Sequence, residues 1–103
     1  MNGKPIVRRA AADEDIEKAI DDDAGESVEV ADRFIDALEK NVELIGKSPR
    51  TGSPRYAHAL NIPGLGFQKI GRFPYLTFYI EQEDYIDLWR VLHERRDIPD
   101  HLH

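Results

Sequence analysis

The spacing of apolar residues changes once along the chain, and this change constrains the fold more than any other feature. Residues 31–45 carry apolar side chains at every third or fourth position with acidic residues between them, which predicts an amphipathic helix. Over residues 75–81 apolar positions alternate instead, which is typical of a β-strand. Helices followed by strands predict an α+β fold. The helical positions are Ala31, Phe34, Ile35, Leu38, Val42 and Ile45.

A shorter apolar stripe predicts a first helix from Ala10 to about Ala24. Acidic residues in its first turns favour the positively polarised start of a helix. Ile16, Ala19 and Ile20 follow the spacing i, i+3, i+4 and form a narrow apolar face. Because only a few residues separate the two helices, we expect them to form an antiparallel hairpin.

Residues with known preferences for helix ends bound the two helices. Gly25 is a natural stop for the first helix, and Ser27 is a suitable N-cap for the second. Gly46 and then Ser48-Pro49 are expected to end the second helix.

The remaining segments predict a small sheet. Short strands are expected over residues 5–9, 67–71, 75–81 and 85–92, and the Pro-, Gly- and Ser-rich residues 48–55 are expected to form a loop. Consecutive strands this close in sequence favour antiparallel pairing. We therefore predict one domain over all 103 residues, with an N-terminal strand and a helical hairpin packed on one face of a small, mainly antiparallel sheet.

The predicted sheet is rich in aromatic residues. Core packing accounts for most of them, but the hairpin covers only one sheet face. Part of the apolar surface is therefore expected to stay open unless another chain covers it, which favours a tight protein partner. The aromatic residues are Phe73, Tyr75, Phe78, Tyr79 and Trp89. In the last strand, Trp89 and Val91 are assigned to one face, and Ile86, Leu88 and Leu92 to the other.

Charge is distributed unevenly along the sequence. The net charge is −6, made of −7 over residues 1–45, +5 over residues 46–80 and −4 over residues 81–103. The acidic residues can simply solvate helix faces, but the acid-free middle segment favours an acidic partner. The overall charge disfavours direct binding of this chain to nucleic acid.

Motifs for familiar chemistry are missing from the sequence. There is no cysteine, which removes disulfides and thiol catalysis. The four histidines lack metal-ligand spacing, so neither a metal nor a cofactor is expected, and His101-Leu102-His103 is interpreted as a frayed end. Gly64-Leu65-Gly66 is interpreted as a tight turn. Without a secretory signal or a membrane span, a cytoplasmic domain is expected.

One constellation of basic residues comes from the sheet and the segment after it. Its arginines can be solvated or paired with nearby acids, the group can form a docking surface for a protein, or it can support ribonucleolytic chemistry with His93 as acid or base. The sequence leaves these three alternatives open. The members are Lys69, Arg72, Arg90, His93, Arg95 and Arg96.

Several motifs, in this order and spacing, resemble the ParE branch of the RelE/ParE superfamily, the toxins of type II toxin–antitoxin modules. The likeness runs over nearly the whole chain. It is carried by Pro49-Arg50-Thr51-Gly52, Pro63-Gly64-Leu65, the stretch Arg72-Phe73-Pro74-Tyr75-Leu76-Thr77-Phe78-Tyr79 and the stretch Leu88-Trp89-Arg90-Val91-Leu92-His93-Glu94-Arg95-Arg96-Asp97-Ile98-Pro99.

The resemblance implies a plasmid-stabilisation toxin that stalls DNA gyrase and inhibits growth without catalysis. It also implies neutralisation by a cognate ParD-like antitoxin, which binds operator DNA through a ribbon-helix-helix domain. Toxins of the sibling RelE branch cut messenger RNA on the ribosome. Where they place an arginine after the tyrosine of the middle strand, this chain has Leu76, which favours the ParE interpretation.

On this interpretation two sets of residues are assigned. The target-facing residues are Arg72, Arg90, His93, Arg95 and Arg96, and the antitoxin is expected at Ile16, Ala19, Ile20 and Phe34 and at the open sheet edge, by groove filling or strand addition. Two rivals remain. One is a ribosome-dependent ribonuclease using Lys69, Arg90, His93 and Arg95, and the other is a degenerate module that only binds its antitoxin.

Overall fold

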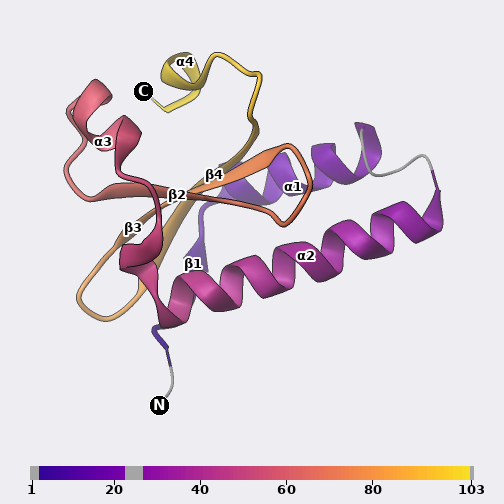
Figure 1. Ribbon diagram of the computed structural model, residues 1–103, viewed down its shortest axis with the longest axis horizontal. Helices are drawn as coiled ribbons and strands as arrows, with labels where there is room; N and C mark the ends of the chain where they lie inside the picture. Colours follow the sequence, from indigo (N-terminus) through magenta and orange to yellow (C-terminus); the bar gives the residue numbers. More distant parts are fainter. Residues whose placement is uncertain (1–2, 23–26, 103) are drawn as a thin grey trace.

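The computed structural model describes residues 3–22 and 27–102. In chain order the elements are β1 (Ile6–Arg8), α1 (Ala10–Asp22), α2 (Val28–Lys47), a 3-10 turn η1 (Pro49–Thr51), α3 (Arg55–Leu60), β2 (Leu65–Lys69), β3 (Tyr75–Glu81), β4 (Ile86–His93) and α4 (Ile98–Leu102) (Figure 1).

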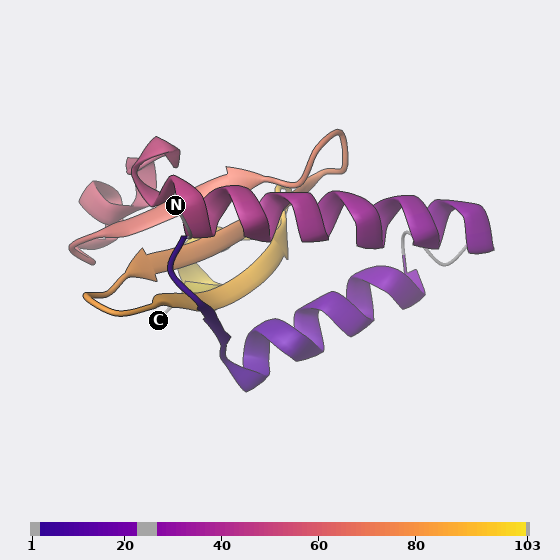
Figure 2. The ribbon, with the colours of Figure 1, turned by 90° about the horizontal axis from the view of Figure 1, so that it is seen from below.

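A four-stranded sheet in the order β1-β4-β3-β2 forms the centre of the molecule. β1 pairs in parallel with β4, and the other neighbours are antiparallel. α1 and α2 run in opposite directions on one side of the sheet (Figure 2). The predicted α+β architecture is therefore confirmed.

The start of α2 is capped as the sequence predicts. The hydroxyl of Ser27 accepts a hydrogen bond from the backbone N–H of Val30 at 3.1 Å, which satisfies one of the free donors at the helix start. The predicted end of α1 at Ala24 and the stop at Gly25 lie outside the described residues.

Gly46 does not end α2, so this part of the prediction is wrong. The helix continues through Lys47, and Ser48 is its C-cap. At Gly46 the N-terminal segment instead crosses the helix. There the backbone N–H of Lys4 donates a hydrogen bond to the Gly46 carbonyl oxygen at 3.0 Å. A Cβ on Gly46 would lie 3.0 Å from the Lys4 carbonyl oxygen, so the glycine permits this close approach.

A bulge in β4 changes which of its side chains share a face. Phe78 pairs with Arg90, but the next residue, Tyr79, pairs with Leu88, so Trp89 is an extra residue. The alternation of faces is therefore interrupted, and the predicted face assignment in β4 is wrong. Ile86, Leu88 and Val91 pack in the clusters that include α1 and α2, whereas Leu92 and Trp89 pack on the opposite side.

Two short helices that the sequence did not predict cover the second face of the sheet. α3 begins at Arg55, the last residue of the predicted loop, and α4 lies at the predicted frayed end, where Leu102 is 5% exposed. The expectation of open apolar sheet surface is therefore wrong. His103 lies outside the described residues. The cluster on this face contains Leu65, Leu76, Phe78, Leu92, Ile98 and Leu102, with Tyr56 and Leu60 packed against it.

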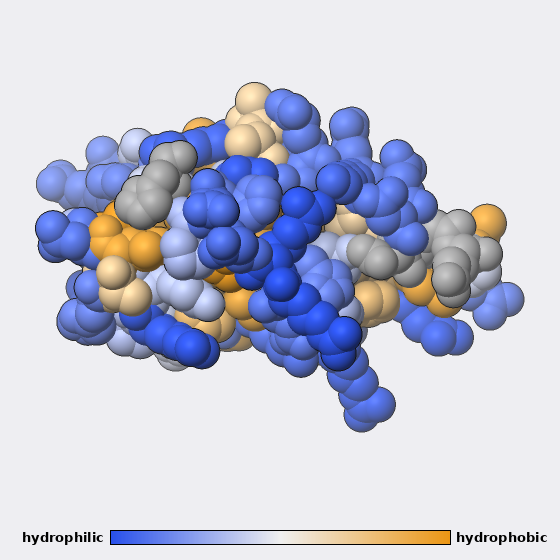
Figure 3. Space-filling view, turned by 90° about the horizontal axis from the view of Figure 1, so that it is seen from above, coloured by the Kyte–Doolittle hydropathy of each residue, from blue (hydrophilic) through white to orange (hydrophobic). Residues whose placement is uncertain are grey.

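Seen from the side that carries α3 and α4, the surface is largely hydrophilic, and apolar residues show only in small separate areas (Figure 3). Among the described residues, no helix has the length and apolar character needed to span a bilayer.

An ion pair joins the N-terminal segment to the end of β3. Lys4 Nζ donates to Glu81 Oε2 at 2.8 Å and to the carbonyl oxygen of Gln82 at 2.6 Å. The hydrogen bond from Lys4 lowers the pKa of the Glu81 carboxyl group. As the pH falls, the Glu81 carboxylate is therefore protonated at a higher pH in the unfolded chain than in the folded chain. The resulting stabilisation is complete above the ordinary glutamate pKa of about 4.3 and is lost as the pH falls through the lower folded-state value.

We expect Lys4→Met to make the free energy of unfolding less dependent on pH below about pH 4.5, because the variant lacks the donor that lowers the pKa of Glu81. The change at neutral pH should stay below about 1 kcal/mol, since both side chains are partly exposed. Urea unfolding at a series of pH values measures this. Lys47→Met removes a more exposed lysine and is the control. Identical pH profiles for the Lys4 variant and the unaltered chain would show that the pair contributes nothing.

Candidate functional site

The turn between β2 and β3 and the segment after β4 lie at the same end of the sheet. Tyr75 pairs with His93, and the backbone N–H of Glu94 donates to the Pro74 carbonyl at 2.9 Å. The sheet register therefore gathers basic side chains from both segments. Lys69, Arg72, His93, Arg95 and Arg96 together are called the basic rim.

Most of the charge in the basic rim is unpaired within the described part of the chain. Arg72, Arg95 and Arg96 are exposed and form no ion pair with any described carboxylate. Lys69 lies 3.5 Å from a carboxylate oxygen of Glu94. The three arginines can therefore meet an acidic partner without first giving up an ion pair with any described carboxylate.

His93 is held in place at the base of the basic rim. Its Nδ1 accepts a hydrogen bond from the backbone N–H of Arg95 at 3.1 Å, so the neutral ring carries its proton on Nε2. The ring also makes an edge contact with Tyr75, with the ring centroids 5.2 Å apart. This orientation fixes one nitrogen and leaves Nε2 as a hydrogen-bond donor.

Arg90 differs from the other predicted target-facing residues because its charge is used inside the molecule. Its guanidinium donates to both oxygens of Asp15, at 2.6 and 2.8 Å, and to the carbonyl oxygen of His101 at 2.9 Å. Asp15 also accepts from the backbone N–H of Val91 at 3.0 Å. The hydrogen bond with Asp15 raises the pKa of Arg90. Arg90 therefore joins α1, β4 and α4 to one another.

Asp15 is not among the predicted site residues, although the sequence carries a signal for it. Ala12, Asp15 and Ala19 follow the spacing i, i+3, i+7 and so share a helix face, and both alanines are buried. A carboxylate on a buried face requires a partner. The spacing could have predicted a cation opposite Asp15, but not that Arg90 supplies it.

The residues predicted to bind the antitoxin lie in or against the core. Ala19 is 2% exposed and Phe34 is fully buried, and Ile16 and Ile20 pack against the same cluster. The Phe34 ring makes an edge contact with the Phe73 ring at 5.2 Å between centroids. A partner could reach Ala19 and Phe34 only if α1 and α2 moved away from the sheet, whereas Ile16 and Ile20 are partly exposed.

The two edges of the sheet differ in accessibility. At β2, Ser53 and Phe67 exchange backbone hydrogen bonds of 2.9 and 3.1 Å, and Asn41 Nδ2 donates to the Lys69 carbonyl at 3.2 Å. At β1, no described segment other than β4 pairs with the strand. The edge that could accept a further strand is therefore β1.

The described side chains give little support to a metal-dependent site or to a site that cleaves phosphate esters. Within residues 3–22 and 27–102, no three His, Asp or Glu side chains are grouped closely enough to hold a metal ion. Leu76 is 8% exposed and packs in the apolar cluster beneath α3 and α4. The middle strand therefore presents no cation at that position.

Comparison with known proteins decides the family. A model of the family described as "ParE toxin of type II toxin-antitoxin system, parDE" matches residues 6–98, from β1 to the first residue of α4. The chain belongs to the ParE toxin family. No curated protein matches this ParE-family sequence. Its fold is similar to that of a solved structure entitled "Chromosomal ParDE TA system from P. aeruginosa", with a TM-score of 0.70 at 15% sequence identity, covering 87% of this chain and 95% of that chain.

Proposed function

We propose that this ParE-family toxin inhibits DNA gyrase by direct protein contact in the cytoplasm, without catalysing a reaction, and that a cognate antitoxin neutralises it. The observation that carries the proposal is the basic rim. It places three exposed arginines, none of which forms an ion pair with a described carboxylate, at one end of an otherwise acidic molecule. Such a localised charge favours docking on an acidic protein surface.

A contact mechanism also agrees with the position of Leu76. A phosphorane needs a positive charge close to the reacting phosphate, and a buried leucine supplies none. The net charge of −6 would moreover repel ribosomal RNA. Both arguments disfavour RNA cleavage.

For the antitoxin we propose an extended segment that adds to the outer edge of β1. Val7 in the middle of this strand is 52% exposed, so an added strand would cover it. The edge at β2 is already occupied by Ser53 and by the Asn41 side chain. Contact with Ala19 and Phe34 would additionally require the hairpin to open, whereas the partly exposed Ile16 and Ile20 could be contacted without that change.

A ribosome-dependent messenger RNA endonuclease is the second candidate. The observation that favours it is the placement of His93 within the basic rim, with Nε2 available for proton transfer and Arg95 two residues further along the chain. On this alternative, His93 would act as general acid or base and the arginines would stabilise the charge on the phosphate.

Two assays on the purified chain separate these functions. We expect micromolar toxin to inhibit supercoiling by purified gyrase and to leave messenger RNA intact in a translation extract. Cleavage of the transcript that is lost in His93→Ala would instead establish the endonuclease. Unchanged supercoiling together with intact RNA, and unaffected growth on expression without antitoxin, would favour a degenerate module.

A further inference from the structure

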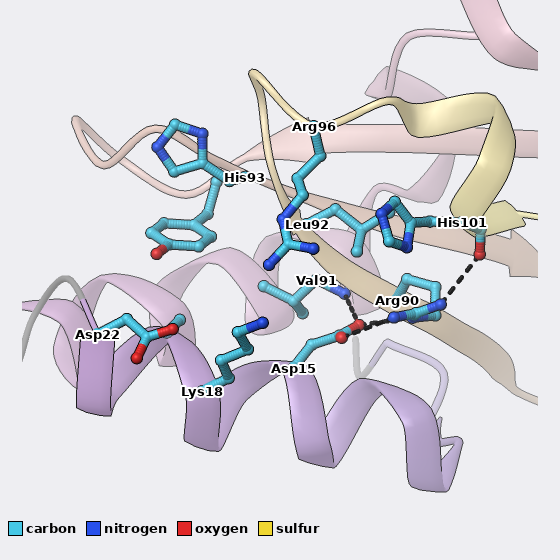
Figure 4. A pocket seen from close by; sticks show the side chains of 11 residues that line it. Asp15, Lys18, Asp22, Arg90, Val91, Leu92, His93, Arg96 and His101 are labelled. Atoms are coloured by element: carbon cyan, nitrogen blue, oxygen red, sulfur yellow. Dashed lines mark hydrogen bonds and ion pairs between the residues drawn. The ribbon is translucent and has the colours of Figure 1, made fainter.

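A pocket of about 350 Å³ opens between α1, β4 and the C-terminal segment, next to the basic rim (Figure 4). Ala19, Val91 and Leu92 supply apolar parts of its lining. Apolar walls raise the strength of charge interactions inside a concave site, because less water screens them. The charged and imidazole side chains around it are Asp15, Lys18, Asp22, Arg90, His93, Arg96 and His101.

One pair of these charges is already neutralised. Asp15 and Arg90 form the bidentate pair, and their remaining hydrogen bonds go to the backbone of Val91 and His101. Neither side chain is therefore free to attract a ligand strongly.

Lys18 and Arg96 are different. They come from α1 and from the segment after β4, and both charged groups point into the pocket and toward each other (Figure 4). Among the described residues, no carboxylate lies within ion-pair distance of either one. Asp22, which lines the same pocket one turn beyond Lys18 on α1, forms no ion pair with any described lysine or arginine. Two positive charges that converge with no described carboxylate within ion-pair distance are an arrangement that an anion stabilises.

We propose that this pocket binds an oxyanion, a carboxylate or a phosphate group, between the Lys18 ammonium and the Arg96 guanidinium. The planar guanidinium matches two oxygens of such a group at once, and the ammonium adds a compact charge from the opposite wall. The site does not depend on gyrase being the target.

Amide spectra of the purified chain test the proposal, with sodium succinate and inorganic phosphate titrated separately at low, constant ionic strength. We expect saturable shifts at residues around Lys18 and over 91–96. Lys18→Met and Arg96→Met should each weaken the apparent affinity by about tenfold, as expected for loss of one charge-assisted contact. Lys40→Met and Arg33→Met, which remove a lysine and an arginine charge on α2 outside the pocket lining, should leave it unchanged.

The probes also distinguish the two sources of the group. Saturation by succinate alone would identify a carboxylate ligand, and saturation by phosphate alone would identify a phosphate ligand. The proposal is overturned if neither probe gives saturable shifts in the pocket. It is also overturned if the two pocket variants, shown to be folded by their own spectra, bind as tightly as the Lys40 and Arg33 controls.

Discussion

Replacing Phe34 with alanine is expected to lower the free energy of unfolding by about 3–5 kcal/mol, because the side chain is fully buried and its removal leaves a cavity. The substitution also removes the edge contacts of the Phe34 ring with Phe73 and Tyr75, whose ring centroids lie 5.2 and 5.5 Å from that of Phe34. Urea unfolding measures the change. Since Phe34 was predicted to bind the antitoxin, this result would assign it to the core.

Ile35→Ala is the matched control for this variant. Ile35 is the next residue on the same helix and is 38% exposed, so its truncation should cost less than about 1 kcal/mol, partly offset by the better helix propensity of alanine. Equal destabilisation by the two substitutions would contradict the assignment of Phe34 to the centre of the core.

Asp15→Ala is expected to lower the free energy of unfolding by about 2–3 kcal/mol, since it leaves the partly buried Arg90 without its counterion and the Val91 N–H without its acceptor. The side chains of Asp15 and Arg90 are only 13% and 24% exposed, so water cannot fully replace the lost contacts. Denaturant unfolding again provides the measurement.

Asp13→Ala is the control on the same helix. Asp13 pairs with Arg8 at 2.8 Å, but these side chains are 54% and 49% exposed, so the loss should be below about 1 kcal/mol. Adding Arg90→Met to Asp15→Ala should recover part of the stability, because the double variant no longer holds an uncompensated charge. A double variant that loses the sum of both single effects would show that the two residues are not coupled.

The elements whose pattern is local could be predicted from the sequence. The apolar spacing around Phe34 and the N-cap at Ser27 depend on neighbours a few residues away, and both are found in the structure. Strand β3 was predicted with its observed limits because its alternation is complete. The short helices α3 and α4 could not be predicted, since helices of five or six residues are stabilised by packing against the sheet more than by their own sequence.

The site was harder to predict than the fold. The grouping of Arg72 with Arg95 and Arg96 follows from the register of β3 and β4, which sequence spacing indicates only approximately. The bulge at Trp89 shifts the faces of β4, and no feature of the sequence required it. The pairing of Arg90 with Asp15 joins residues 75 positions apart, so it depends on the tertiary arrangement of α1 on the sheet.

Contact between the basic rim and gyrase is the central claim, and charge reversal tests it most directly. The measurement is the toxin concentration that half-inhibits supercoiling, compared between the unaltered chain and the double variant Arg72→Glu with Arg95→Glu. A matched variant, Arg33→Glu with Lys40→Glu on α2, changes the net charge by the same amount elsewhere. The account predicts inhibition by the unaltered chain and by the α2 variant, and at least about tenfold weaker inhibition by the rim variant. Equal inhibition by all three proteins, or no inhibition by the unaltered chain, would contradict it.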